Sequence, residues 1–298
     1  MPIAMLAFRI FNFSRRAATA FGIARPVRGL LGPSIGRIVY RLSAKSDSPN
    51  LVQGHRMFLA TKGQYPPIRM ALGQYEPETT RLFERLIKPG MAVLDIGAHV
   101  GYFSLLAAKQ AGPSGRVFSF EPHPDNYSLL IKNVKENAYE TITTVNQGAS
   151  ATSGNSTLHQ SRLDNGRHSI YRQDLLQQGS VPISTTSMDD FFGVIDWPKI
   201  DLVKIDVEGA ELDVLSGMAG LLERCRDIRL IVELNPVSLE QAQVEPISLP
   251  KTLESLGFVL HMVDSLSEPS KLHGHELRPL IDRLYSSGDS VNLYCFRN

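Results

Sequence analysis

The segment "AVLDIGAHVGYFSLLAAKQAG" (residues 92–112) decides the fold class that we predict for this chain. "AVLDIG" (92–97) is a short apolar run with Gly97 at its end, which is typical of a buried strand followed by a tight turn. "YFSLLAAKQAG" (102–112) continues as a helix that ends near Gly112. A strand, a glycine turn and a helix in this order indicate the first unit of an α/β protein.

The same alternation continues along the chain. Strands are predicted at 115–122, 142–150, 200–209, 228–236, 257–264 and 290–298, and helices at 77–90, 125–138 and 210–225. Apolar strands that alternate with helices favour a mostly parallel sheet with helices on both faces and ligands at the carboxyl ends of the strands. The stretch 151–199 breaks this rhythm. Its segment "STLHQSRLDNGRHSIYRQ" alternates around Asn165-Gly166, which predicts a β-ribbon inserted after the third strand.

Composition limits the classes of function. The 298 residues, 43% hydrophobic and 20% charged, are typical of a soluble globular protein, and a net charge of +1 gives no indication of a nucleic-acid partner. Cys225 and Cys295 lack CxxC spacing, so we expect neither a disulfide framework nor a structural zinc site. No apolar run reaches the roughly 18–20 residues that span a bilayer, and we therefore expect a cytoplasmic protein.

Residues 1–46 differ from the rest of the chain. They carry eight Lys/Arg and no Asp or Glu, whereas the remainder holds 23 basic and 30 acidic residues. We therefore expect a basic helical extension (1–46) before a main domain (47–298). Three interpretations of the extension stay open: packing on the main domain, a targeting sequence, or peripheral contact with an anionic membrane surface.

The first strand-to-helix turn points to an adenosine ligand without a diphosphate. Asp95, Gly97 and Gly101 have the spacing D-x-G-x-x-x-G, not the G-x-G-x-x-G of a pyrophosphate site, and an acid here attracts a cationic ligand. A plain turn with a capping Asp is the alternative. Glu121 ends the second strand, where a carboxylate accepts hydrogen bonds from both ribose hydroxyls. S-adenosylmethionine, an adenosine with a sulfonium and an amino acid, satisfies both features.

Five segments together resemble the FkbM family of S-adenosylmethionine-dependent methyltransferases. They are "LDIGAHVGYFSLLAA", "FEPHPDNYSLLIKN", "VPISTTSMDDFF", "DLVKIDVEGAELDVLSGM" and "IVELNP", within about residues 70–265. The resemblance implies a Rossmann-like class I methyltransferase fold, with a seven-stranded sheet in the order 3-2-1-4-5-7-6 and strand 7 antiparallel. It also implies methylation of a hydroxyl group of a sugar or natural product.

The resemblance assigns a set of cofactor-binding residues. These are Asp95, Gly97 and Gly101 around the methionine moiety, Glu121 at the ribose, Gln147, Gly148 and Ala149 near the adenine, and Glu76, beside Tyr75, as a lid contact. His99 stands where the family usually has Asn, which leaves open an acid–base role or a tolerated substitution. His123 and His168 are further candidates for contact with the cofactor or the acceptor.

The segment "KIDVEGAEL" (204–212) supplies the expected catalytic carboxylates. In the implied strand order, strand four lies beside strand one, so Asp206 and Glu208 lie at the ligand edge of the sheet. Either carboxylate can accept the proton of the acceptor hydroxyl, orient that hydroxyl, or bind the amino group of the cofactor. Glu211 falls in the first turn of the following helix, where it stabilises the helix dipole.

Lys204 raises the question of its partner. It lies two residues before Asp206, on the same face of a buried strand, and a buried ammonium must be paired. We predict an ion pair between Lys204 and Glu233 on the next strand. Asp206, Glu233 and Asn235 could instead bind Mg²⁺, but we do not favour this metal site because Lys204 would compete for Glu233.

The sequence thus predicts an S-adenosylmethionine-dependent O-methyltransferase. Its acceptor would be a hydroxyl of a sugar, glycolipid or secondary metabolite, with Asp206, Glu208 and His99 as catalytic candidates. Two alternatives are kept: an NAD(P)-dependent oxidoreductase with a similar strand–glycine–helix–acid layout, and a non-catalytic, membrane-associated binding module of the same fold.

Overall fold

The computed structural model describes residues 48–59, 69–70, 73–161, 167–171, 177–264 and 268–297. Contacts divide the chain into two units, Met1–Tyr75 and Glu76–Asn298. The first unit contains an antiparallel pair, β1 (Asn50–Val52) and β2 (His55–Met57). The predicted extension, 1–46, lies outside the described residues, so the boundary at residue 47 stays a prediction.

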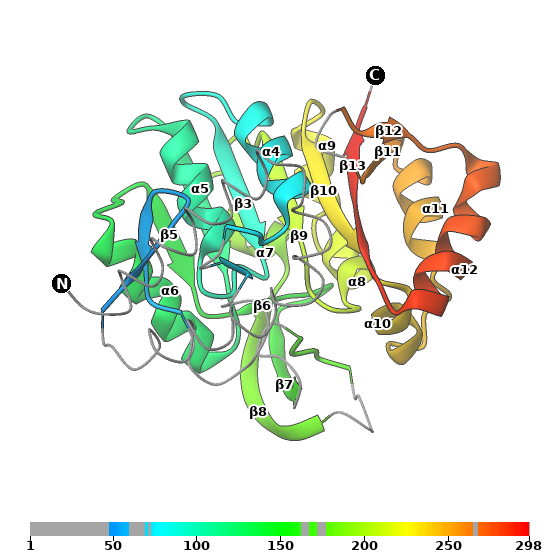
Figure 1. The fold of residues 1–298 in the computed structure, drawn as a ribbon, viewed down its shortest axis with the longest axis horizontal. Helices are drawn as coiled ribbons and strands as arrows, with labels where there is room; N and C mark the ends of the chain where they lie inside the picture. The colour runs from blue at the N-terminus through cyan, green and yellow to red at the C-terminus, as the bar shows by residue number, and fades with distance from the viewer. Residues whose placement is uncertain are drawn as a thin grey trace, which may run out of the picture. The chain divides into compact units, whose positions relative to one another are not determined.

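The second unit alternates strands with helices (Figure 1). Its strands are β3 (Ala92–Ile96), β4 (Arg116–Phe120), β5 (Ile142–Val145), β6 (Gly148–Ala149), β7 (Gly154–Ser161), β8 (Gln177–Thr186), β9 (Leu202–Ile205), β10 (Arg229–Leu234), β11 (Val259–Val263), β12 (Ser270–Lys271) and β13 (Val291–Phe296). Its helices are α4 (Pro77–Leu86), α5 (Tyr102–Ala111), α6 (Pro124–Glu136), α7 (Met188–Gly193), α8 (Glu211–Ser216), α9 (Ala219–Arg224), α10 (Pro236–Gln241), α11 (Ser248–Ser255), η1 (Gly274–Glu276) and α12 (Leu277–Ser287). None of the helices in the described ranges is both long and apolar enough to cross a bilayer.

The main sheet confirms the predicted strand order. Its order is β12-β11-β13-β10-β9-β3-β4-β5, and β13 runs antiparallel to both β10 and β11. The strands β5, β4, β3, β9 and β10 are mutually parallel. The sheet is therefore that of a class I methyltransferase fold. The difference from the prediction is an eighth strand, β12, a two-residue edge strand whose exposed polar residues give no apolar signal.

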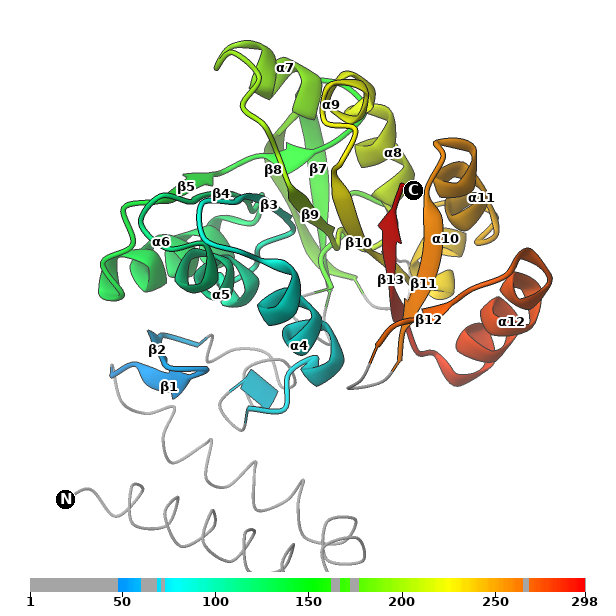
Figure 2. The ribbon, with the colours of Figure 1, turned by 90° about the horizontal axis from the view of Figure 1, so that it is seen from above.

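Helices cover both faces of the sheet. Figure 2 shows α4, α5 and α6 on one side and α7, α8 and α9 on the other. Every residue of β3 is buried, because its side chains alternate between these two layers. Leu94 and Ile96 join the apolar cluster under α7–α9, whereas Asp95 faces α5, where Ser104 donates to its carboxylate. One face of the strand is thus purely apolar, and the other carries a buried carboxyl group.

Two predicted elements are interrupted. The predicted strand 142–150 divides into β5 and β6, because the chain bends at Asn146, whose amide donates to the carbonyl oxygens of Glu121 and Pro122. The predicted helix 210–225 divides into α8 and α9 at Gly217. A Cβ at Gly217 would lie 2.1 Å from the carbonyl oxygen of Ser150, so another segment of backbone occupies the space beside this turn.

The predicted β-ribbon is present. β7 and β8 pair antiparallel, with β6 added alongside β8 in a separate three-stranded sheet. The proposed turn at Asn165-Gly166 lies outside the described residues. Ser169, beyond that turn, pairs through its backbone with His159 of β7. In Figure 1 the ribbon extends below the carboxyl ends of the central strands, so it is placed to cover that edge of the main sheet.

Gly97 is required by a backbone contact. Its φ of +84° lies in the left-handed region, and a Cβ at this position would lie 1.9 Å from the carbonyl oxygen of Asp206. The turn after β3 therefore packs directly on the residue that follows β9. A glycine is therefore needed here for the contact between these two parts of the chain, whether or not a ligand is bound.

Replacing Gly97 with Ala should destabilise the protein by at least about 2 kcal/mol, because the new Cβ adds a backbone clash to an unfavourable φ. Urea unfolding followed by circular dichroism would measure this loss. Gly274→Ala is the matched control, since a Cβ at Gly274 meets nothing within 4 Å. Equal stability of the two variants would contradict the proposed contact.

Candidate active site

A pocket lies at the carboxyl ends of β3, β4 and β9, beneath the ribbon. Its lining includes seven of the predicted site residues: Gly97, His99, Glu121, Gly148, Ala149, Asp206 and Glu208. Phe120 and Val207 contribute apolar lining from the strand ends, and Leu158 and Ile170 do so from the ribbon segment. The pocket thus combines acidic groups at separate points with apolar walls between them.

Four predicted cofactor-binding residues do not line this pocket. Asp95 is buried beneath α5, and Gly101 caps the amino end of α5, where a Cβ would meet the side chain of Leu130. Gln147 is half-buried between β5 and β6. Glu76 precedes α4, and its carboxylate accepts a hydrogen bond of 3.0 Å from the side chain of Asn292 on β13.

Glu121 is held by backbone donors on both of its oxygens. The N–H of His99 donates to Oε2 and the N–H of His123 donates to Oε1, each at 2.9 Å. His99 has a φ of +51°, an uncommon conformation for a residue with a side chain. Burial raises the pKa of Glu121 to about 7, against the lowering effect of these hydrogen bonds. Glu121 is therefore a fixed acceptor group in the pocket wall.

The ribbon contributes a histidine to the pocket. The Nδ1 atom of His168 accepts a hydrogen bond of 3.1 Å from the N–H of Ser161, so the neutral ring carries its proton on Nε2. Burial lowers the pKa of His168 to about 3, and nearby His123 adds to the effect. His168 is thus neutral near pH 7 and has an N–H donor available, so it is poorly suited to act as a base.

The ribbon is also fixed to the loop after β9 and to α8. The hydroxyl of Ser169 donates to the carbonyl oxygen of Glu208 at 2.7 Å, and the hydroxyl of Tyr171 donates to Asp213 at 2.5 Å. Sequence reasoning named His168 but missed Leu158 and Ile170. The alternation of apolar and polar residues in the ribbon could have indicated them, but only the fold shows which face of the ribbon lies toward the pocket.

The predicted ion pair between Lys204 and Glu233 is wrong. Lys204 Nζ lies 2.5 Å from Asp206 Oδ2, two residues along its own chain. Glu233 instead accepts a hydrogen bond of 2.7 Å from the hydroxyl of Ser290. Lys204 is aligned with Asp95 on one side and with Ile231 on the other, so the nearest carboxylates on its face are those of β3 and of its own strand end.

Lys204 is the centre of a buried electrostatic network. The side chain is 2% exposed and packs over the ring of Phe103. Burial lowers its pKa, but the carboxylates of Asp206, Glu76 and Asp95 outweigh this and raise it above its usual value. Asp95 and Glu76 therefore stabilise the ammonium from within the fold.

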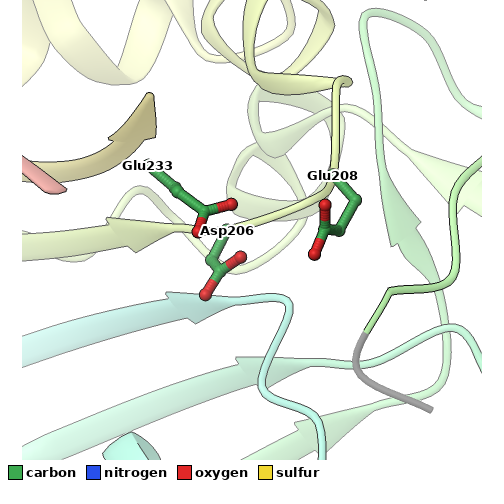
Figure 3. A group of neighbouring side chains, drawn as sticks. All are labelled: Asp206, Glu208 and Glu233. Carbon is green, nitrogen blue, oxygen red and sulfur yellow. The ribbon is translucent and has the colours of Figure 1, made fainter. Parts of the chain in front are cut away.

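Asp206, Glu208 and Glu233 lie together where β9 and β10 end (Figure 3). Glu208 adopts a φ of +50°, and its Oε2 accepts hydrogen bonds from Ser238 Oγ at 2.7 Å and Asn235 Nδ2 at 3.3 Å. Burial and the neighbouring Asp206 raise the pKa of Glu208 to about 8. Burial also raises the pKa of Glu233 well above its ordinary value. Glu208 and Glu233 thus hold their protons more tightly than they would in water.

Glu211 has a larger structural role than the predicted helix-start charge. It is 1% exposed, and its carboxylate accepts hydrogen bonds from the N–H groups of Val207 and Gly209. Burial raises its pKa to about 7. Glu211 therefore fixes the loop that carries Asp206 and Glu208 without itself lining the pocket.

One family model matches more than half of the chain. Residues 95–260 match the family model described as the Methyltransferase FkbM domain. The chain is 31% identical over 179 residues to the hexuronic acid methyltransferase AglP of Haloferax volcanii, an alignment that covers 60% of this chain and 67% of AglP. It is 28% identical over 148 residues to Methyltransferase 1 of Beauveria bassiana, covering 42% of this chain and 57% of that protein.

Among solved structures, the O-methyltransferase TomG from Streptomyces achromogenes matches with a TM-score of 0.43 at 12% identity. The match covers 75% of this chain and 80% of TomG. The fold assignment therefore rests on the strand order of the main sheet and not on this match.

Replacing Glu211 with Gln should reduce the pH dependence of stability. The pKa of Glu211 is raised from 4.5 to about 7, so its stabilising contribution is complete below pH 4.5 and is lost as the pH rises through about 7. Between pH 4.5 and 8 the wild type should lose about 3 kcal/mol more unfolding free energy than Glu211→Gln.

Urea titrations at the two pH values would measure this difference. Glu223→Gln, at an exposed position of α9, is the matched control and should behave as the wild type does. An identical pH dependence of wild type and Glu211→Gln would contradict the assignment.

Proposed function

We propose a reaction for this chain, which belongs to the FkbM methyltransferase family and is an S-adenosylmethionine-dependent methyltransferase. The proposed reaction is the methylation of a hydroxyl oxygen of a sugar, glycolipid or secondary metabolite. The observation that carries the proposal is the acidic edge formed by Asp206 and Glu208 on the lining of the pocket. A hydroxyl acceptor must lose its proton as it is methylated, and a carboxylate at this edge can receive it. The relative named as a hexuronic acid methyltransferase supports a sugar acid as the first acceptor class to test.

The described residues fit the cofactor. When bound, S-adenosylmethionine supplies an electrophilic methyl group on its sulfonium. We assign the ribose hydroxyls to Glu121, whose oxygens accept hydrogen bonds from two backbone N–H groups and from the side chain of Asn126 and keep lone-pair capacity for a further donor. Phe120 and Ala149 offer apolar surface for the adenine, and the turn at Gly97 would contact the methionine moiety.

Asp95, Gly101, Gln147 and Glu76 take revised roles in this proposal. Asp95 and Glu76 act through Lys204, by stabilising the ammonium that holds Asp206. Gly101 shapes the amino end of α5, and Gln147 links β5 to β6. None of the four is assigned a direct contact with the cofactor.

We assign the proton acceptor to Asp206. Its side chain is 21% exposed, and Lys204 fixes one of its oxygens. Glu208, with a pKa of about 8, keeps its proton at neutral pH and would orient the acceptor through hydrogen bonds. His99 positions Glu121 through its backbone N–H, and a further role of its ring in proton transfer stays a prediction.

The alternatives are set aside by the family membership. An NAD(P)-dependent oxidoreductase and a non-catalytic module are both inconsistent with a methyltransferase family match over residues 95–260. The proposed acceptor is a small molecule or a glycan. Contact of residues 1–46 with a membrane stays a separate prediction.

Replacing Glu121 with Gln should weaken S-adenosylmethionine binding by about ten- to a hundredfold, because hydrogen bonds to a charged group contribute about 1.5–3 kcal/mol. Isothermal titration calorimetry would measure the dissociation constant. Glu140→Gln, at an exposed position before β5, is the control and should bind normally. Unchanged binding by a folded Glu121→Gln protein would remove Glu121 from the cofactor site.

Incubation with S-adenosylmethionine and a panel of hexuronic acid glycosides, neutral sugars and phenols should release S-adenosylhomocysteine and give an O-methylated product. Asp206→Asn should lower kcat by at least about a hundredfold, with little change in cofactor affinity. Asp227→Asn, at an exposed position before β10, should keep full activity. Methylation at nitrogen or carbon, or full activity of Asp206→Asn, would contradict the proposed reaction.

A further inference from the structure

The three carboxylates at the ends of β9 and β10 form a convergent group of oxygen atoms. Asp206, Glu208 and Glu233 each offer one carboxylate oxygen, and these atoms lie within 4.8 Å of one another. Figure 3 shows the carboxyl groups side by side, with Asp206 and Glu208 on the loop after β9 and Glu233 on β10. Oxygen atoms at such separations can bind one shared cation at the usual metal–oxygen distances of about 2.1–2.4 Å.

Each carboxylate is fixed through one oxygen by a donor outside the group. Lys204 Nζ contacts Asp206 Oδ2, Ser238 Oγ donates to Glu208 Oε2, and Ser290 Oγ donates to Glu233 Oε1. Metal-binding carboxylates are commonly oriented in this way by hydrogen bonds to the oxygen that does not bind the metal.

The second oxygen of Glu233 points to a ligand. Its Oε2 atom is buried from solvent and accepts no hydrogen bond from any part of the chain that the structure describes. A buried carboxylate oxygen without a partner is costly, so it needs a proton or a cation. Asp206 and Glu208 supply the only other carboxylates in this convergent group among the described residues.

The charge of the group favours a divalent ion. With all three carboxylates ionised, as metal ligands are, the one ion-paired cation, Lys204, would leave two negative charges for the ion to balance. Arg167 of the ribbon attracts Glu208 electrostatically, but the two make no ion pair. Lys204 contacts Asp206 Oδ2 and not Glu233, so Glu233 is left for an ion, and Asp206 would bind that ion through its other oxygen.

We propose that Asp206, Glu208 and Glu233 bind one hard divalent cation, Mg²⁺ or Mn²⁺. The donors are all oxygen, which suits these ions and disfavours zinc or copper. Glu121 lies at the end of β4, whereas this site lies where β9 and β10 end, on the other side of β3. The ion would therefore hold the acceptor hydroxyl rather than the cofactor, and this role, unlike the binding itself, rests on the proposed function.

Binding can be tested with Mn²⁺ alone and the full chain, without cofactor or acceptor. Electron paramagnetic resonance of free Mn²⁺ should show one site per chain, with Mg²⁺ competing for it. Glu233→Gln keeps the shape of the side chain and an acceptor for Ser290, but removes the charge. It should weaken Mn²⁺ binding by at least about tenfold.

Glu240→Gln is the matched control, because Glu240 lies on nearby α10, is exposed, and is not part of the group. It should bind Mn²⁺ as the wild type does. If Glu233→Gln does not fold by circular dichroism, Glu208→Gln provides the same comparison.

Absence of Mn²⁺ binding at millimolar concentration, or equal affinity of the wild type and the folded carboxylate variant, would overturn the proposal. Displacement of Mn²⁺ by S-adenosylmethionine would also overturn it, since the carboxylates would then belong to the cofactor. A chain that binds Mn²⁺ at this site but methylates no hydroxyl would retain the metal site and refute only the proposed reaction.

Discussion

The buried ammonium of Lys204 is the interaction on which the site depends. It lies in the middle of the central sheet, where an unpaired charge would be strongly destabilising. Its pairing with Asp206 therefore fixes the first residue beyond β9, at 2.5 Å. Through Asp95 the same charge is coupled to the packing of α5, because Asp95 accepts a hydrogen bond from Ser104. The acidic edge is thus an extension of the polar face of the sheet.

Close backbone packing positions the two loops that form the pocket. Gly97 allows the turn after β3 to contact the carbonyl oxygen of Asp206, and Gly209 allows the next loop to approach Ser238. A Cβ at either glycine would lie within 3 Å of a carbonyl oxygen. The pocket acids are consequently held by the main chain on one side and by buried donors on the other, an arrangement that can position reacting groups.

The two ends of the pocket use carboxylates in different environments. Glu121 is held by two backbone N–H groups and by the side chain of Asn126, an arrangement suited to a fixed hydrogen-bond acceptor. Glu208 is held by side-chain donors, and another carboxylate lies beside it, so it retains a proton more tightly. This difference supports the separation of a cofactor-binding end from an end that handles the proton of the acceptor.

Local sequence patterns predicted the strands of the sheet well, but they did not predict where one strand is interrupted or which side chain pairs with Lys204. Apolar runs and glycine turns identified β3, β4, β9 and β10, because a strand buried on both faces has few other compositions. They did not show that the strand from residue 142 bends at Asn146, since the hydrogen bonds that hold this bend go to residues 121 and 122. The partner of Lys204 was also missed, because spacing along the chain gives the face of a residue but not the reach of its side chain.

The sequence by itself determined the alternation of strands and helices and the identity of the acidic residues, because apolar periodicity and glycine turns are local features. The family, and the strand order that it implies, came from the resemblance of segments such as "KIDVEGAE". Only the tertiary structure decided which of these acids line the pocket. Asp95 and Glu121 both lie at the carboxyl end of a buried strand in sequence, yet Asp95 is turned beneath α5 and Glu121 lines the pocket. The direction of a side chain at a strand end depends on the packing of both sheet faces, which involves residues far apart in the chain.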